Sequence, residues 1–390
     1  MADNLNDDFD EGELDFPELN NPIESIEDQY KKGIFRVVYQ SNNFFMPQLL
    51  EMIKNKEILN IRPEYQRRLK WDNKRKSLLI ESLLLNIPIP PLFFYEKDMA
   101  SYEVMDGQQR INAIREFYNN EFKLSNLNIL EKLNGSYYKN LHPILAKGLN
   151  RASLSVNVLL LESEEKEKDP QKIRRYVFER LNTGGRRLND QEIRNCIYAG
   201  SFNNMIIDIS RDKLFTRSWD IPDYDPTEGY ESAERKKNSL YKNMYDCQLV
   251  LRFFALKSEK NISGSMKSIL DRTMDKYKNT KKDSIDTMKS EFLMCLQAAV
   301  SIFGDKPFKI ITAAGEYKNS APLFDAIMVS IYRNKGYLDS LIKSKKNIAA
   351  GVMGLIKNDS SYSTLVGKGN TSQAIKDRIN LVENVLKNHI

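Results

Sequence analysis

Short apolar runs alternate with stretches of helical periodicity along the first half of the chain. The apolar runs predict strands at residues 34–40, 92–95 and 152–162, and another strand that ends at Asp106-Gly107. Apolar residues spaced three or four positions apart predict helices at residues 46–55 and 74–86, one after Gly107, and two between 170 and 200. This alternation predicts a domain with both helices and strands.

From residue 202 onward the pattern is helical, with polar breaks. The clearest predicted helices cover residues 240–257, 266–277, 287–303 and 373–388. The chain therefore divides near residue 200 into an α+β domain at 31–200 and an all-α domain at 201–390. The loop at residues 219–235, which contains Trp-Asp-Ile-Pro-Asp-Tyr-Asp-Pro, is the best boundary candidate.

The most informative local motif is Asp-Gly-Gln-Gln-Arg at residues 106–110, called here the DGQQR turn. Asp106 is a favourable helix N-cap, Gln109 could complete a capping box, and Gly107 permits close approach to the backbone. Arg110 opposes the helix dipole, and an anion bound at the helix start would resolve that conflict. The residues alone support equally well a plain cap with Arg110 in solvent.

Two further polar motifs could hold an anion. Gln66 and Arg67 lie in a loop ahead of a helix, where Arg67 could clamp a phosphate or pair with an acid. The second motif joins a glycine turn to a basic pair, and its members could form an anion nest or simply end one helix and cap the next. Its residues are Asn182, Gly184, Gly185, Arg186 and Arg187, followed by Asn189 and Glu192 as a capping box and by Arg194.

These motifs occur in an order that resembles a known family. After the Gln-Arg loop come a helix, Pro-Ile-Pro-Pro at residues 88–91, a strand, and the DGQQR turn. This order is similar to that of the ParB/sulfiredoxin-like fold, and more narrowly to the N-terminal half of GmrSD-type modification-dependent restriction enzymes. Further matching blocks are Phe-Glu-Arg-Leu-Asn-Thr-Gly-Gly at 178–185 and Tyr-Asp-Cys-Gln-Leu-Val-Leu-Arg-Phe-Phe at 245–254, so the resemblance covers about residues 35–260.

The resemblance implies a ParB/sulfiredoxin-like α+β domain followed by an all-α domain, in a protein of bacterial anti-phage defence. It also implies binding of a nucleoside triphosphate, with Mg²⁺, at the DGQQR turn. Arg110 and the helix N–H groups would hold the phosphates, with Gln66, Arg67 and Gly107 beside them. Gln108 or Gln109 could orient the attacking water, and Asp106 could hold the metal or cap the helix.

Three functions remain open on the sequence. The first is a nucleotide-hydrolysing regulatory protein that recognises DNA, plain or modified, and acts with an effector or nuclease partner. The second is a DNA- or partner-binding module without turnover. The third is a metal-dependent DNA nuclease, disfavoured because the two histidines, His142 and His389, lie in contexts unlike an HNH centre.

Composition indicates the compartment. Cys196, Cys247 and Cys295 are far apart and lack metal-ligand spacing, so buried thiols in a reducing compartment are expected. The N-terminus does not have a signal-peptide pattern, and no apolar run is long enough to span a membrane. We therefore expect a cytoplasmic protein.

Charge separates the first thirty residues from the rest. Residues 1–30 carry eleven acidic and no basic side chains, whereas residues 31–390 carry 59 basic against 42 acidic ones, a net charge of +17. The segment is expected to be disordered. It either serves solubility only or is an acidic arm that competes with nucleic acid for the basic body.

The arm hypothesis makes a testable prediction. Removing residues 1–30 should tighten DNA binding at low salt, because the arm would no longer compete for the basic side chains, and the gain should shrink as salt screens both attractions. DNA affinity of the truncated and full chains, titrated over a range of ionic strength, measures this. Equal affinities at every salt concentration would leave a solubility tail.

Overall fold

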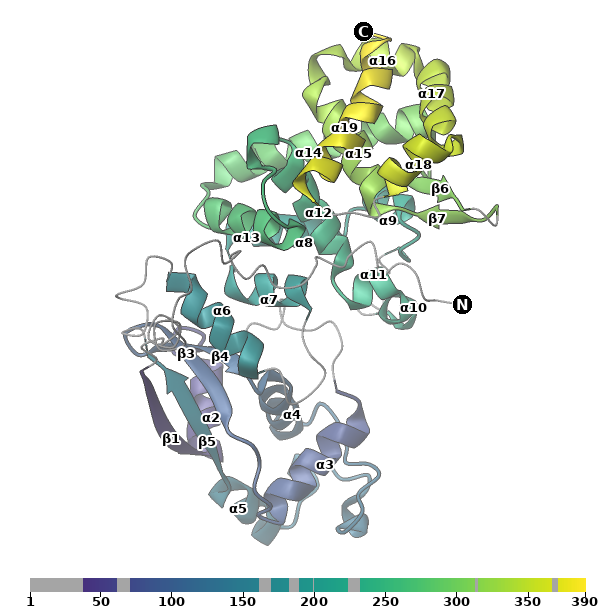
Figure 1. The fold of residues 1–390 in the computed structure, drawn as a ribbon. Helices are drawn as coiled ribbons and strands as arrows, with labels where there is room; N and C mark the ends of the chain where they lie inside the picture. Colours follow the sequence, from purple (N-terminus) through teal and green to yellow (C-terminus); the bar gives the residue numbers. More distant parts are fainter. Residues whose placement is uncertain are drawn as a thin grey trace, which may run out of the picture. The chain divides into compact units, whose positions relative to one another are not determined.

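The computed structural model describes residues 38–61, 71–160, 170–181, 189–198, 200–223, 232–312, 315–366 and 371–390. The chain divides into two compact units, with Ile197 in the N-terminal one and Tyr198 in the C-terminal one. Figure 1 shows the elements of each unit. The acidic segment at 1–30, Gln66 and Arg67, and the turn with Asn182, Gly184, Gly185, Arg186 and Arg187 lie outside the described residues.

The N-terminal unit alternates strands and helices. Its strands are β1 (Tyr39–Phe45), β2 (Leu59–Asn60), β3 (Leu92–Asp98), β4 (Ser101–Asp106) and β5 (Ser153–Leu159). Its helices are α2 (Met46–Lys54), α3 (Asn73–Leu84), α4 (Gln108–Tyr118), α5 (Pro143–Arg151), α6 (Pro170–Leu181) and α7 (Asp190–Ile197), with short 3-10 helices at Glu131–Leu133 and Tyr138–Asn140.

The strands form one mixed sheet in the order β1-β5-β3-β4-β2. The β1–β5 and β3–β4 pairs are antiparallel, whereas β5–β3 and β4–β2 are parallel. The β3–β4 register shifts at two points, and one shift leaves Met105 extra, because Phe93 lies opposite Asp106 while Phe94 lies opposite Val104. Such an irregularity re-aims the end of a strand, and here it immediately precedes the DGQQR turn.

Alternation along the strands gives the sheet two different faces. Phe94 and Val104 belong to a core that also contains apolar side chains of α2, α3, α4 and α5. Their neighbours Tyr95 and Glu103 point to the other face, where α6 contributes Arg174. Helices therefore pack on both faces of the central strands.

A buried carboxylate fixes one long loop to α3. The side chain of Glu81 is 5% exposed and accepts backbone N–H groups of Ile129 and Leu130 at 2.9 and 2.7 Å, and of Asn128 at 3.4 Å. Burial by itself would raise the pKa of Glu81, but the hydrogen bonds from Leu130, Ile129 and Asn128 together lower it.

The C-terminal unit is largely helical. Its helices are α8 (Ser201–Ile209), α9 (Lys213–Ser218), α10 (Ala233–Lys237), α11 (Ser239–Lys242), α12 (Tyr245–Leu256), α13 (Met266–Tyr277), α14 (Lys282–Phe303), α15 (Ala321–Arg333), α16 (Leu338–Lys343), α17 (Lys345–Lys357), α18 (Asp359–Val366) and α19 (Ser372–Lys387). Short 3-10 helices lie at Glu259–Asn261 and Lys335–Tyr337, and β6 (Lys309–Ile311) pairs with β7 (Tyr317–Asn319) in an antiparallel hairpin.

Two almost wholly buried helices, α12 and α15, form the centre of this unit. Arg252 of α12 donates from Nε to Oδ1 of Asp325 on α15 at 2.9 Å, and Arg378 of α19 lies 3.9 Å from the same carboxylate. All three side chains are fully buried. A charge removed from water in this way requires a close partner, so Asp325 fixes how the three helices meet.

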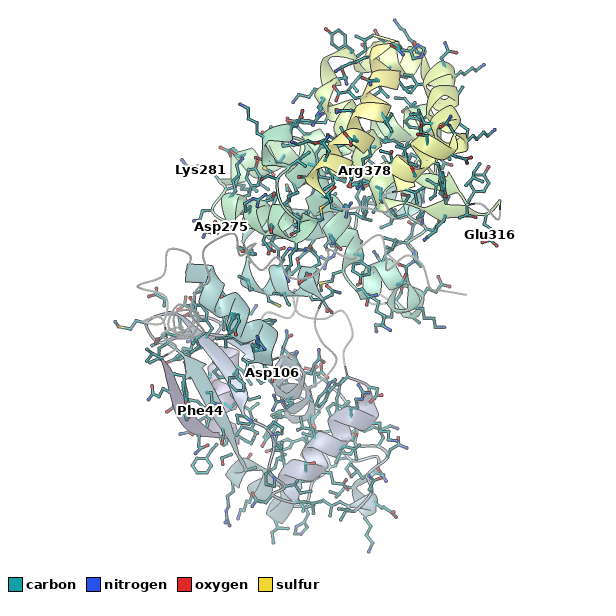
Figure 2. All side chains as sticks on the ribbon, in the orientation of Figure 1. Phe44, Asp106, Asp275, Lys281, Glu316 and Arg378 are labelled. Atoms are coloured by element: carbon teal, nitrogen blue, oxygen red, sulfur yellow. The ribbon has the colours of Figure 1, made fainter. Side chains whose placement is uncertain are left out.

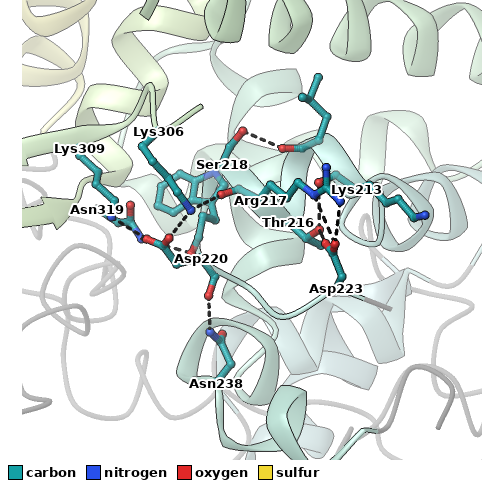
Figure 3. A network of polar contacts seen from close by, with 12 residues as sticks. Lys213, Thr216, Arg217, Ser218, Asp220, Asp223, Asn238, Lys306, Lys309 and Asn319 are labelled. Atoms are coloured by element: carbon teal, nitrogen blue, oxygen red, sulfur yellow. Dashed lines mark hydrogen bonds and ion pairs between the residues drawn. The ribbon is translucent and has the colours of Figure 1, made fainter. Parts of the chain in front are cut away.

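The predicted boundary at residues 219–235 is wrong, because the loop begins inside the C-terminal unit. Trp219 is 1% exposed and packs against Phe308 and Phe324. Asp220 beside it binds Lys306, Lys309 and Asn319, as Figure 3 shows. The pattern of prolines and aspartates could not show what the preceding tryptophan contacts.

The overall prediction of an α+β region followed by a helical region is confirmed. Three details differ. The predicted strand at 34–40 overlaps β1 only at its end, because β1 continues through polar residues at the edge of the sheet. The predicted helix at 240–257 is divided at Met244, whose φ is +57°. The β6–β7 hairpin was not predicted, since its strands have three residues each.

Glu81 allows a test of stability against pH. Because folding lowers its pKa, the carboxylate stabilises the fold at neutral pH and this stabilisation is lost as pH falls through the unfolded pKa of about 4.3 and below. Glu81→Gln should cost roughly 1–3 kcal/mol of unfolding free energy at pH 7. The cost should shrink below about pH 4.

Urea unfolding over pH 3–8 (about the range in which carboxylates titrate) measures the effect. Glu57→Gln is the matched control, because the Glu57 side chain is exposed. A cost for Glu81→Gln that is independent of pH would contradict a stabilising role for the charge.

Candidate functional site

The DGQQR turn joins the end of β4 to the start of α4. Asp106 is the last residue of the strand, and its place in the N-terminal unit is labelled in Figure 2. Gly107 is the N-cap of α4 and has a φ of +96°, a conformation that residues with a side chain rarely adopt. A Cβ on Gly107 would also meet Cδ2 of Leu92 at 2.2 Å. Glycine is therefore required here by both the backbone angle and the neighbouring strand.

The predicted capping roles are wrong. The helix has no side-chain cap, and Asp106 precedes the cap position instead of occupying it. Gln109 uses its Oε1 to accept the backbone N–H of Trp71 at 3.1 Å, so it does not complete a capping box. The positive φ of Gly107 moves the start of the helix one residue later than the sequence pattern suggested.

Arg110 is held by groups of the protein itself. Its Nη2 donates to Oδ2 of Asp106 at 2.7 Å and to the carbonyl of Pro91 at 3.3 Å, and its Nη1 donates to the carbonyl of Pro90. The Arg110 side chain is 12% exposed, while that of Asp106 is 38% exposed. Burial lowers the pKa of Arg110, and the charge of Asp106 opposes this effect.

This arrangement explains how a positively charged Arg110 is accommodated in the first turn of α4. A cation in the first helical turn opposes the dipole, and the carboxylate one turn earlier compensates it within the chain. Arg110 also joins two motifs that are separate in sequence, because the proline carbonyls belong to Pro-Ile-Pro-Pro at residues 88–91. The planar guanidinium reaches these three oxygens from two nitrogens held in a fixed fork, a geometry that the single ammonium of a lysine does not have.

The two glutamines hold the chain on either side of the Gln-Arg loop. The buried amide of Gln108 donates from Nε2 to the carbonyl of Ile61 at 2.8 Å. Gln109 accepts from Trp71, as described above. Ile61 and Trp71 are the last and first described residues before and after residues 62–70. The DGQQR turn thus holds the described residue on each side of residues 62–70.

A buried ion pair connects the same strand to the second sequence block. Nη2 of Arg174 donates to Oε2 of Glu103 at 2.7 Å, and its guanidinium lies 4.3 Å from the centre of the Tyr95 ring. The same Nη2 lies 3.4 Å from the carbonyl of Cys196 on α7. Sequence reasoning missed this pair, although a glutamate inside the run Tyr-Glu-Val-Met at 102–105 was its signal.

The predicted capping box of α7 is confirmed. Asn189 Oδ1 accepts the N–H of Glu192, and Glu192 Oε2 accepts the N–H of Asn189, both at 2.9 Å. Arg194 is 1% exposed, with Nη1 3.5 Å from Gln191 Oε1. The structure therefore places Glu192 and Arg194, two of the proposed nucleic-acid contacts, inside the protein instead of on its surface.

A pocket of about 250 Å³ is lined in part by residues of the proline turn. Its lining includes Ile87, Pro88 and Ile89 together with Ser153 and Ser155 of β5, and none of residues 106–110. The pocket and the DGQQR turn are thus separate features that share one connecting turn.

Metal and thiol chemistry are limited in the part of the chain that the structure describes. Within it, no three His, Cys, Asp or Glu side chains gather in a way that could hold a metal. A Mg²⁺ ion at Asp106 would have to take its other ligands from phosphates and water, which is common for this ion. The prediction of buried thiols is confirmed, because Cys196, Cys247 and Cys295 are all buried and free. Among the described helices, none combines the length and apolar character needed to cross a membrane.

Gly107 generates a stability prediction with a matched control. Gly107→Ala should destabilise the fold by about 2–5 kcal/mol, since a left-handed φ costs roughly 1–2 kcal/mol and the clash with Leu92 adds to it. Gly135 has a similar φ of +86° but open space around the position of a Cβ. Gly135→Ala should therefore cost only about 1–2 kcal/mol in the same denaturant titration. Equal costs would show that the contact with Leu92 relaxes freely.

Comparison with known proteins supports the motif-based resemblance. Residues 47–199 match the family model described as "GmrSD restriction endonuclease, N-terminal domain". Neither the curated proteins nor the solved structures give a match. The matched segment contains the proline turn, the DGQQR turn and the α6–α7 block. Residues 47–199 are therefore similar to the N-terminal domain of GmrSD restriction endonucleases.

Proposed function

We propose that this chain is a nucleotide-binding and nucleotide-hydrolysing regulatory protein of restriction-type phage defence that recognises DNA. The family match supports the restriction-type role. The observation that carries the nucleotide site is the pair of Arg110 and Asp106, 2.7 Å apart at a helix start without a side-chain cap. The ParB/sulfiredoxin-like assignment is part of the same proposal, since relatives of that fold bind phosphates at the matching turn.

The pair has complementary groups for a metal-bound triphosphate. The side chain of Asp106 is 38% exposed, and its carboxylate does not cap the helix α4. A bound Mg²⁺ would neutralise phosphate charge beside this carboxylate. The guanidinium of Arg110 would then exchange one of its present oxygen partners for a phosphate oxygen, while its charge continues to compensate the carboxylate.

The glutamines have different roles in this proposal. Gln108 is buried and bonded to Ile61, so it acts as a positioning residue for the loop. Gln109 is only partly buried and has its oxygen on Trp71, which makes it the better candidate to orient an attacking water through its amide group. Gln66 and Arg67 remain predicted phosphate contacts, outside the described residues.

DNA recognition rests on the family and on charge. Residues 31–390 carry a net charge of +17, which favours contact with phosphate backbones. Arg186 and Arg187 remain predicted contacts, also outside the described residues. An effector or nuclease partner would supply the cleavage that a regulatory chain of this kind directs.

Calorimetry on Arg110 variants tests the nucleotide site. Arg110→Ala should weaken nucleotide binding by about 1.5–3 kcal/mol, roughly a 10- to 100-fold loss, because a charged fork to phosphate is removed. Arg110→Lys should recover only part of that loss, since the fork geometry is absent. Asp106→Asn should weaken binding in Mg²⁺ more than in its absence.

Arg272→Ala is the matched control. The Nη2 of Arg272 also donates to a backbone carbonyl, that of Ser263, but in the C-terminal unit. Phosphate release from each common nucleotide, with and without plain and modified DNA, then separates turnover from binding alone. Unchanged binding of every nucleotide by folded Arg110→Ala would place the site elsewhere, and binding without turnover would favour a non-enzymatic module.

The same samples decide the nuclease alternative. Incubation with Mg²⁺ or Mn²⁺, nucleotide, and plasmid or modified phage DNA should leave the DNA intact when this chain is alone. Specific cleavage that disappears in Asp106→Ala or Glu192→Ala would overturn the regulatory proposal in favour of a metal-dependent nuclease. Glu192→Ala also removes the α7 cap, so its folding must be verified by thermal unfolding.

A further inference from the structure

The strand β1 lies at one edge of the sheet, next to β5 (Figure 1). Two backbone hydrogen bonds lie at the two ends of its pairing with β5. Leu160 N–H donates to the carbonyl of Val38, and Met46 N–H donates to the carbonyl of Ala152. In an antiparallel pair, alternate residues bond to the neighbouring strand. The even-numbered residues of β1 therefore face β5, and the N–H and C=O groups of Tyr39, Ser41 and Asn43 point away from it.

Phe45 supports this assignment. Its N–H, which should also point outward, donates to Oε1 of Gln48 at 3.0 Å and not to β5. The helix α2 thereby closes the C-terminal end of the edge. The outward groups of Tyr39, Ser41 and Asn43 lie beyond the reach of that cap.

This edge lacks the usual protection against another strand. Natural edge strands are blunted by lysines, prolines, inward charges or bulges. The sequence of β1 is Tyr-Gln-Ser-Asn-Asn-Phe-Phe, without a charge or a proline, and its register with β5 has no shift. Its aromatic ends are open, with Tyr39 66% and Phe45 52% exposed. Such a strand has the chemistry of an addition site.

We propose that the occupant of this edge is β1 of a second copy of the chain, paired antiparallel about a two-fold axis at Asn42. This register places Ser41 opposite Asn43 of the second copy and Tyr39 opposite Phe45 of the second copy, and each pair occurs twice. The outward backbone groups of Ser41 and Asn43 then bond across the seam. Aromatic pairs lie at both ends, where they stabilise antiparallel strands.

Side-chain bonds within each copy prepare this arrangement. Ser41 Oγ donates to Asn157 Oδ1 at 2.7 Å, and Asn43 Oδ1 accepts from Ser155 Oγ at 2.6 Å. The donor groups of the Asn43 amide can then reach the Ser41 oxygen of the second copy. The strand's palindromic pattern, aromatic–polar–polar–aromatic on one face, is what favours a second copy over an unrelated peptide.

Charge favours the same site. The chain carries a net charge of +6 and its residues 31–390 carry +17, whereas the strand β1 adds no charge of its own to a contact between two copies. In the sheet order, β5 and β3 separate β1 from β4, which carries Asp106 at its end. Two strands therefore lie between the paired edge and the strand that leads into the DGQQR turn, and the inference does not depend on the proposed nucleotide site.

Mass measurement on the full chain tests the proposal. Sedimentation equilibrium or light scattering, over about 1–100 µM where modest interfaces associate, should show a concentration-dependent dimer. Asn43→Lys should shift the chain to monomer by at least tenfold in the dissociation constant, because two lysines would enter the seam. Ser153→Lys adds the same charge at an exposed position on the interior strand β5 and should leave the dimer unchanged.

Cross-linking tests the register and does not depend on how Asn43→Lys folds. Tyr39→Cys combined with Phe45→Cys should form an inter-chain disulfide, since opposed residues of antiparallel strands lie about 5.5 Å apart. Either single substitution should not, because like positions would be about 20 Å apart in this register. The three native cysteines are buried, which keeps the background low. A monomer at every concentration, or a dimer without this cross-link, would overturn the proposal.

Discussion

The guanidinium of Arg110 is the contact on which the N-terminal unit's candidate site depends. It ties the start of α4 to the end of β4 through Asp106 and to the proline turn through two carbonyls. A cation in the first turn of a helix is unfavourable by itself, and its neighbours make it stable. The three oxygens that satisfy Arg110 also fix the relative positions of two motifs that lie apart in this sequence.

Next to this contact, the side chains of Gln108 and Gln109 form hydrogen bonds with backbone groups of an earlier part of the chain. Each side chain bonds to one described end of the segment 62–70, so the turn organises the chain before it as well as the helix after it. Gly107 makes the arrangement possible, because only a residue without a side chain fits its φ beside Leu92. Binding of a phosphate at this turn would therefore act on groups that already hold the surrounding chain.

Buried charges perform a comparable structural role elsewhere in each unit. Glu103 and Arg174 connect the sheet to α6, and Asp325 connects Arg252 and Arg378 in the helical unit. Each pair would be costly if one partner were lost, since the remaining charge could not be hydrated. Polar groups thus specify which elements meet, while the apolar residues around them supply most of the favourable burial.

The sequence alone determined the order of elements, the change from α+β to helical structure, the α7 capping box and the resemblance of residues 47–199 to a known domain, because hydrophobic period and local motifs report on neighbours in the chain. It suggested that Asp106 caps α4 and that Arg110 either meets a bound anion or reaches solvent. Only the tertiary structure showed that the cap is Gly107 and that Arg110 is met by Asp106 and the prolines. Those partners are set by the φ of one glycine and by a turn some twenty residues away, which no local pattern records.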